Sequence, residues 1–119
     1  MADDAPYRVR VDLSPLRVRV EHGGVAVADS RRALLLLEQR HAPVFYLPVE
    51  DVRMDLLEPT ERRTRCPHKG EARYFTVTGG ERPAENGAWV YDAPLAGVAA
   101  IKGRIAFYPD RLDWFEIVA

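Results

Sequence analysis

At 119 residues, with 47% hydrophobic and 29% charged residues, the chain is long enough to form one globular domain with its own core, spanning residues 1–119. Its formal net charge of -1 lacks the basic excess typical of proteins that bind nucleic acid, so nucleic acid is not an expected partner. No run approaches the roughly 18 apolar residues that cross a bilayer. The start of the chain is acidic where a signal peptide is basic, so we expect a cytoplasmic protein without a membrane partner.

Alternation of polar and apolar residues predicts strands in the first part of the chain. Arg8–Val11 and Arg17–Val20 both read RVRV, the period-two pattern of strands with one face on a core and one in solvent. Ser14-Pro15 marks a turn between them. Gly23-Gly24 should close a hairpin into Val25–Ala28, because glycine readily adopts the positive φ angles of tight turns.

The segment from Arg31 to Arg40 has two interpretations. Asp29-Ser30 can cap a short helix, and the following leucine-rich stretch has good helix propensity. Four consecutive leucines, Leu34–Leu37, are equally typical of a buried strand. Periodicity does not separate the two possibilities here, and both remain open.

The rest of the chain predicts short strands separated by turns that contain Gly, Pro and Asn. The expected strands are 44–46, 63–66, 72–77, 88–91, 99–101 with 105–108, and 112–115. Strands at this spacing favour an all-β fold, either a sandwich, a barrel or a bent double sheet. We therefore expect a compact all-β domain of two bent antiparallel sheets, with at most one short helix near residues 31–40.

Reactive side chains concentrate in Thr64–Gly70, which holds the only cysteine, Cys66, together with His68 and Lys69. At the end of a strand, Cys66 can present a thiol that Lys69 would favour as thiolate; the alternative is a buried small hydrophobe. Lys69 suits an anion contact or, if desolvated, an amine nucleophile; the alternative is a solvated or salt-bridged lysine. His68 is a possible general base, although a turn residue is the simpler interpretation.

Several ordered segments carry a resemblance to a known family. They are Gly24–Ser30, Glu38, Pro43–Pro48 with Asp51-Val52, the run TRCPHKGEARY over 64–74, Trp89–Tyr91 with Pro94, Ile101–Gly103 and Ala106–Tyr108. Over about residues 7 to 115 the chain resembles the bacterial and fungal family known as domain of unknown function DUF427. Many members begin with His-Pro-Ile where this chain reads Tyr7-Arg8-Val9, so the resemblance assigns no histidine here.

The resemblance implies an Mss4-like or β-tent fold, in which two antiparallel sheets meet at an angle. Many proteins of that wider group hold zinc with two Cys-x-x-Cys pairs. This chain has neither pair, so we expect no metal and no cofactor. The family also carries a nucleotidyltransferase label, but the sequence has no Gly-rich phosphate loop and no obvious Asp-x-Asp metal pair.

Two acids are candidate site residues. Asp51 matches a position of the family and can orient a base or pair with a cation; the alternative is an aspartate that caps a turn. Glu38 is the lone acid after four leucines and would be costly to bury without a partner. It is therefore a rim residue or the partner of a buried cation, with a site acid of raised pKa as the less favoured alternative.

Four aromatic residues alternate with smaller residues on the expected strands, so that some of them share a face. Core packing explains most of this pattern, but aromatic residues with polar tips also line pockets for small planar ligands. The candidate ligand-binding residues are these four and the second lysine, which also precedes a glycine: Tyr46, Tyr74, Trp89, Tyr91 and Lys102.

Two main functions remain. In the first, the domain binds a small metabolite in an aromatic-lined pocket and acts on it through Cys66, Lys69, Asp51 and Glu38. A lone thiol would favour nucleophilic or acid–base chemistry over disulfide cycling, because no resolving cysteine is present. In the second, the same pocket only senses or carries a ligand. A protein-interaction module with an exposed strand edge is a third reading, disfavoured by the arginine-bearing strands. The sequence indicates neither a substrate nor an oligomeric state.

Overall fold

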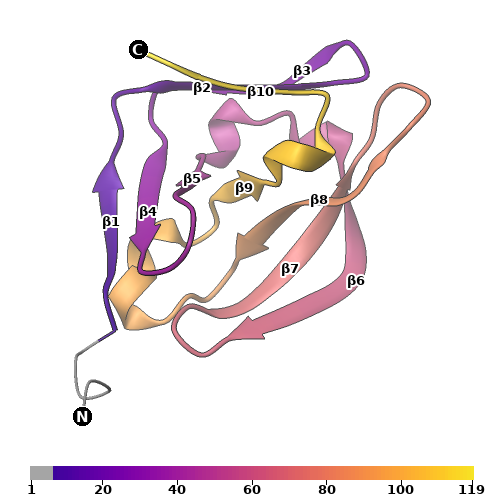
Figure 1. Cartoon of the computed structure of the whole chain (residues 1–119). Helices are drawn as coiled ribbons and strands as arrows, with labels where there is room; N and C mark the ends of the chain where they lie inside the picture. Colours follow the sequence, from indigo (N-terminus) through magenta and orange to yellow (C-terminus); the bar gives the residue numbers. More distant parts are fainter. Residues whose placement is uncertain (1–6) are drawn as a thin grey trace.

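The computed structural model describes residues 7–119, in which ten strands are joined by turns and short 3-10 helices (Figure 1). The strands are β1 (Val9–Leu13), β2 (Arg17–His22), β3 (Val25–Ser30), β4 (Leu34–Glu38), β5 (Val44–Tyr46), β6 (Leu57–Cys66), β7 (Gly70–Val77), β8 (Ala84–Tyr91), β9 (Ile105–Phe107) and β10 (Trp114–Val118). The 3-10 helices are η2 (Val49–Asp51), η3 (Met54–Leu56), η4 (Ala96–Ile101) and η5 (Pro109–Arg111). None of the helices in this part of the chain has the length and apolar character needed to cross a membrane.

The strands form three antiparallel sheets, ordered β1-β4-β5, β10-β2-β3 and β6-β7-β8-β9. In Figure 1 the second sheet lies across the top, the first at the left and the third slopes through the lower right. Leu47 and Ile105 exchange two backbone hydrogen bonds of 2.8 Å, which join the first sheet to the third between β5 and β9. The all-β class is confirmed, with three sheets where two were expected.

The number of sheets is larger than expected because the chain passes from the first sheet to the second between β1 and β2. Pro15 has no N–H to donate, so a ladder cannot continue through it. Instead, Ser14 donates its backbone N–H to the Ala33 carbonyl at 2.9 Å, and Ser14 Oγ accepts from the Leu16 N–H at 3.2 Å. The expected turn is therefore a crossing between two sheets, while the expected Gly23-Gly24 hairpin joins β2 to β3 as predicted.

The segment at residues 31–40, which the sequence allowed as a helix or a strand, contains a strand. Leu34–Glu38 forms β4, which pairs with β1 on one side and β5 on the other. A central strand satisfies its backbone groups on both edges, which suits a run of leucines more than an exposed short helix. The Glu38 side chain is buried at the end of this strand.

One expected strand is wrong. Residues 99–101 belong to η4, where Val98 and Ile101 are buried three positions apart. The backbone of η4 is kinked at Val98, where φ is -131° and ψ is 27°, and it does not form an extended strand. The other expected strands are present with shifted ends: 63–66 is the end of a longer β6, and 112–115 overlaps only the start of β10.

Two groups of buried side chains fill the interior. One lies against the inner face of β2, where Val18 and Val20 are fully buried. The other joins β4 and β5 to β7, β8 and η4, and it is rich in tyrosine. Its members are Leu36, Tyr46, Ala72, Tyr74, Tyr91, Val98, Ile101 and Ala106. This second group surrounds the candidate site.

Candidate functional site

A small cavity of about 190 Å³ opens among the aromatic side chains of the second core group. We call it the aromatic cavity. Its aromatic walls are Tyr46 from β5, Tyr74 from β7, Trp89 and Tyr91 from β8, and Tyr108 after β9. The remaining lining residues are Leu36, Glu38, His41, Ala42, Val44 and Lys69.

Strand geometry places these rings on one face. Tyr74 and Trp89 are paired directly across β7 and β8, and Tyr91 lies two residues after Trp89, so all three side chains point to the same side of the sheet. The Trp89 ring is 4.4 Å from that of Tyr108 and 6.3 Å from that of Tyr46, measured between centroids. Trp89 Nε1 also donates a hydrogen bond of 3.3 Å to the Tyr46 hydroxyl.

The hydroxyls of Tyr46, Tyr91 and Tyr108 remain neutral over the physiological range. Burial raises the pKa of Tyr46 and of Tyr91 well above the usual value for tyrosine, and it also raises that of Tyr108. Neutral hydroxyls both donate and accept hydrogen bonds. The walls of the cavity can therefore meet polar groups of either kind.

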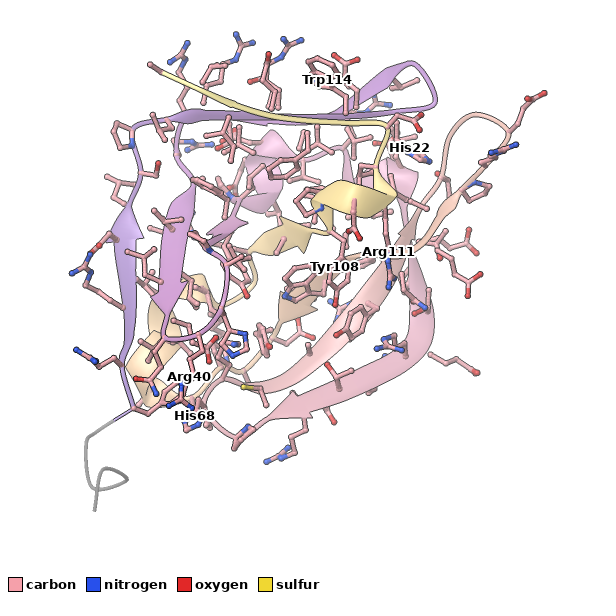
Figure 2. The ribbon with its side chains drawn as sticks, viewed as in Figure 1. His22, Arg40, His68, Tyr108, Arg111 and Trp114 are labelled. Carbon is pink, nitrogen blue, oxygen red and sulfur yellow. The ribbon has the colours of Figure 1, made fainter. Side chains whose placement is uncertain are left out.

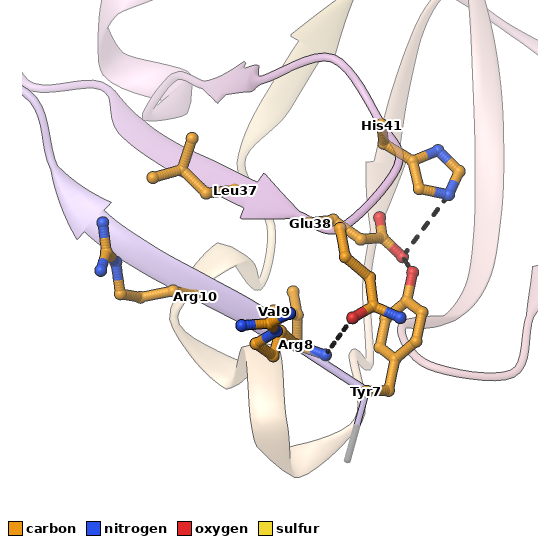
Figure 3. A pocket seen from close by; sticks show the side chains of 8 residues that line it. Tyr7, Arg8, Val9, Arg10, Leu37, Glu38 and His41 are labelled. Atoms are coloured by element: carbon orange, nitrogen blue, oxygen red, sulfur yellow. Dashed lines mark hydrogen bonds and ion pairs between the residues drawn. The ribbon is translucent and has the colours of Figure 1, made fainter. Parts of the chain in front are cut away.

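Glu38 is the acid at the cavity, and its side chain is only 3% exposed. Lys69 Nζ lies 2.5 Å from Glu38 Oε1, and the Tyr7 hydroxyl donates to Oε2. His41 Nε2 is 4.0 Å from Oε2. Figure 3 shows Tyr7 and His41 approaching the carboxylate from two sides.

Two opposing effects act on the pKa of Glu38. Burial would raise it, but the hydrogen bonds from Lys69 and Tyr7 and the positive charge of Lys69 lower it more, and the pKa falls below its usual value. The carboxylate is therefore ionised at neutral pH. For Tyr7, desolvation and the adjacent carboxylate raise the pKa to about 12.

The turn between β6 and β7 places Lys69. Lys69 donates its backbone N–H to the Cys66 carbonyl at 3.3 Å and accepts from the Leu95 N–H at 3.0 Å. Gly70 follows with a φ of 109°, a conformation that L side chains rarely adopt. His68 in the same turn stacks on the Tyr7 ring, with centroids 3.6 Å apart and planes 1° from parallel. In Figure 2, His68 lies below the carboxyl end of β4. The β6–β7 turn therefore positions both groups that donate to Glu38, because it carries Lys69 and its His68 stacks on Tyr7.

A second, larger cavity of about 670 Å³ is also lined by Glu38, and Figure 3 shows its lining side chains. They come from β1, β4 and the residues next to these strands, and Glu38 and His41 are shared with the aromatic cavity. Tyr7 lines the larger cavity only. Glu38 therefore stands at the boundary between the two.

The structure brings together six of the residues singled out from the sequence. Glu38, Lys69, Tyr46, Tyr74, Trp89 and Tyr91 all line the aromatic cavity. The inference that a buried Glu38 needs a cationic partner is confirmed by Lys69. Lys69 is accordingly a salt-bridged lysine, the alternative to a free amine nucleophile.

Cys66 is half-buried next to the site but does not line the cavity. It ends β6, one turn before Lys69. Behind the effect of burial, Cys66 also contributes to the raised pKa values of Tyr46 and Tyr91, which places its thiol close to them. The Lys69 ammonium is engaged by Glu38, so it is less available to stabilise a thiolate.

Asp51 and Lys102 lie away from the cavity. Asp51 accepts hydrogen bonds from Ser30 Oγ at 2.7 Å and from Arg32 Nη2 at 2.8 Å, so it ties η2 to the end of β3. Hydrogen bonding to Arg32 lowers the pKa of Asp51. Lys102 is exposed after η4 and does not line the aromatic cavity. Neither residue is brought to Glu38.

Sequence reasoning missed Tyr7, His41 and Tyr108. Tyr108 had a detectable signal, because it is the last residue of the predicted strand 105–108 and follows another aromatic residue, Phe107. Tyr7 and His41 had none, since each reaches Glu38 only through the pairing of β1 with β4 and the turn that follows. No group of three or more His, Cys, Asp or Glu side chains within residues 7–119 is arranged to hold a metal ion.

The fold and the site define an all-β domain with a buried ion pair at the wall of an aromatic cavity. A family model described as a domain of unknown function, DUF427, matches residues 10–117. The chain belongs to this family, as its ordered segments indicated. No curated protein is detectably similar to it in sequence.

Proposed function

We propose that the protein binds a small planar molecule in the aromatic cavity, with Glu38 and Lys69 as its charged contacts. The observation that supports this function most is the position of the ion pair. Removing two charges from water costs several kcal/mol per ion, and apolar residues in their place are often as stable or more so. A pair kept at the wall of a cavity suits recognition of a ligand more than stability.

The cavity limits the size and shape of the ligand. An apolar cavity of roughly 150 Å³ accommodates benzene, so about 190 Å³ suits a single ring with one substituent. The aromatic side chains that line the cavity offer apolar contacts to a planar ligand, and neutral tyrosine hydroxyls offer hydrogen bonds. The expected ligand is therefore a one-ring compound with at least one polar group.

Fluorescence of Trp89 can test this function. Trp114→Phe removes the other tryptophan, which is 49% exposed on the second sheet. We expect a set of one-ring compounds to include at least one that quenches Trp89 saturably and raises the unfolding temperature. The double variant Glu38→Gln with Lys69→Met should weaken that compound about tenfold or more.

Asp51→Asn is the matched control, because it neutralises an acid outside the cavity. Binding should be unchanged in this variant. The function is rejected if no compound of the set binds, or if the double variant, shown to be folded, binds as tightly as the parent.

Acid–base catalysis is a second candidate function. It is favoured by the three proton-bearing groups that surround the Glu38 carboxylate, namely Tyr7, Lys69 and His41. Once a ligand is found, its conversion can be followed by proton NMR in the parent and in Lys69→Met, Glu38→Gln and Cys66→Ala. Turnover that is lost on changing Lys69 or Glu38 supports catalysis by the pair. If no conversion occurs in the parent, or if all three variants retain it, catalysis by these groups is ruled out.

A further inference from the structure

Two arginines stack on tyrosine rings that line the aromatic cavity. The Arg62 guanidinium, on β6, lies 4.9 Å from the centroid of the Tyr74 ring. The Arg111 guanidinium, in η5, lies 4.6 Å from the centroid of the Tyr108 ring. Both rings line the cavity, and Figure 2 shows Arg111 beside Tyr108. The two cations therefore come from distant segments to neighbouring walls of one cavity.

These guanidinium groups form no ion pair within residues 7–119. Arg111 Nη1 donates only to the carbonyls of Glu85 and Asn86, both at 3.3 Å. Some other arginines are already engaged: Arg17 and Arg73, for example, are each paired with an aspartate. Arg62 and Arg111 thus retain their capacity to bind an anion.

The positive charges of Arg62 and Arg111 both act on the hydroxyl group of Tyr108. Burial and the neighbouring Tyr74 raise the pKa of Tyr108, while the positive charges of Arg111 and Arg62 act in the opposite direction. Glu38 is the only acid among the residues that line the cavity, and Lys69 already compensates its charge. The Tyr108 end of the cavity is therefore electropositive.

We propose that the ligand of the aromatic cavity is a small planar carboxylate, with its ring against Trp89 and its anionic group bound by Arg62 or Arg111. This inference rests on the proposed binding function and adds the charge and chemical class of the ligand. Guanidinium groups match a carboxylate with two parallel N–H donors, which makes such bonds strong and directional. Stacking on tyrosine also holds each guanidinium in place before the anion arrives.

A cationic ligand is the opposite possibility, because aromatic walls with one carboxylate are a common site for ammonium groups. Here the carboxylate is already engaged by Lys69 and Tyr7. Two outer ring faces are occupied by arginines as well. A cation would enter a cavity with three cationic side chains around it, which like-charge repulsion opposes.

The test uses the full chain with Trp114→Phe and three probes of equal size: benzoate, benzamide and benzylamine. We expect benzoate to bind at least about tenfold more tightly than benzamide, and benzylamine to bind most weakly. The double variant Arg62→Gln with Arg111→Gln should remove this advantage of benzoate and leave benzamide within about twofold. Rising salt concentration should weaken benzoate alone.

Arg65→Gln is the matched control, since it removes the same charge from an exposed position of β6 that contacts neither tyrosine. It should leave all three affinities unchanged. If benzamide or benzylamine binds as tightly as benzoate, or if Arg62→Gln with Arg111→Gln leaves the preference for benzoate intact, the carboxylate proposal is overturned while binding in the cavity stands. If none of the probes binds, the carboxylate proposal is overturned, and a wider set of one-ring compounds then decides whether the cavity binds anything.

Discussion

At the scale of single residues, the carboxylate of Glu38 is the group on which the site depends. It is nearly inaccessible to solvent, and it is held by a lysine and a tyrosine that lie 31 residues away on either side in the chain. The sequence predicted that this acid would need a cation if buried. It could not name the cation, because Lys69 reaches Glu38 only through the packing of the β6–β7 turn against the end of β4.

Lys69→Met should destabilise the protein strongly, because it leaves a buried carboxylate without its cation. Breaking a buried ion pair by removing one partner costs about 3–5 kcal/mol, and the two side chains here are 13% and 3% exposed. Urea unfolding at neutral pH measures the loss. The exposed Lys102→Met should change the free energy of unfolding by less than about 0.5 kcal/mol. A Lys69→Met protein as stable as the parent would show that the pair is not formed.

The same variant should have a reversed dependence on pH. In the parent, the pKa of Glu38 lies below its usual value near 4.5, so its contribution to stability is present above that pH and is lost as the pH falls through the folded pKa. Without Lys69, burial dominates and the pKa rises. The cost of Lys69→Met should then shrink between neutral pH and about pH 4, as the carboxyl group takes up a proton. Adding Glu38→Gln should restore part of the lost stability.

Ionisation of the tyrosines provides a separate check on burial. Tyr7, Tyr46, Tyr91 and Tyr108 all have pKa values raised above the usual value near 10, that of Tyr7 to about 12. Tyrosinate absorbance at about pH 10.5 should therefore be much smaller in the folded protein than in urea. Because the unfolded chain releases these protons first, stability should fall as the pH rises above about 10. Equal titration curves in both states would contradict these raised pKa values.

At the scale of elements, turns decide which strands meet. The hairpin at Gly23-Gly24 was predictable from its glycines, but its contact with the distant loop after β7 was not. A Cβ on Gly23 would lie 2.4 Å from the Gly80 nitrogen. Next to it, buried His22 holds the same loop through Nε2, which lies 2.7 Å from the Arg82 carbonyl oxygen. This close approach aligns the second and third sheets.

Alanine substitution of the two glycines should separate backbone strain from this contact. Both residues have positive φ angles, 62° for Gly23 and 77° for Gly24, so each substitution should cost about 1–2 kcal/mol. A Cβ on Gly24 meets no atom within 4 Å. Gly23→Ala should therefore cost about 1–3 kcal/mol more than Gly24→Ala, because the loop must move away. Urea midpoints of the two variants measure the difference, and equal midpoints would contradict the contact.

The segment at residues 31–40 is one whose secondary structure the local sequence pattern could not decide. Leu34–Leu37 is compatible with a helix or a strand by itself, and pairing with β1 and β5 selects the strand. The same limit of local pattern explains residues 99–101, where alanines and an isoleucine resembled a strand but form the end of η4. In both cases the deciding interactions come from segments far away in the sequence.

At the scale of the whole molecule, the site arises where the first and third sheets are joined. The aromatic residues were predictable as a group that shares a face, because residues two apart on a strand point the same way. The cavity among them was not predictable, since it depends on the bridge between Leu47 and Ile105 that brings β5 beside β9. Asp51 is the opposite case. Its place in the chain suggested a site acid, but in the structure Asp51, on η2, forms an ion pair with Arg32.

The most direct measurement is a crystal structure of the protein soaked with benzoate and, separately, with benzamide. Electron density for a ring inside the aromatic cavity, in contact with Trp89 and near the wall formed by Glu38 and Lys69, is the expected result. Density for the benzoate carboxylate should lie within hydrogen-bond distance of Arg62 or Arg111. A cavity that stays closed or filled only with water, with both compounds absent or bound elsewhere, would contradict the proposal that this domain binds small molecules there.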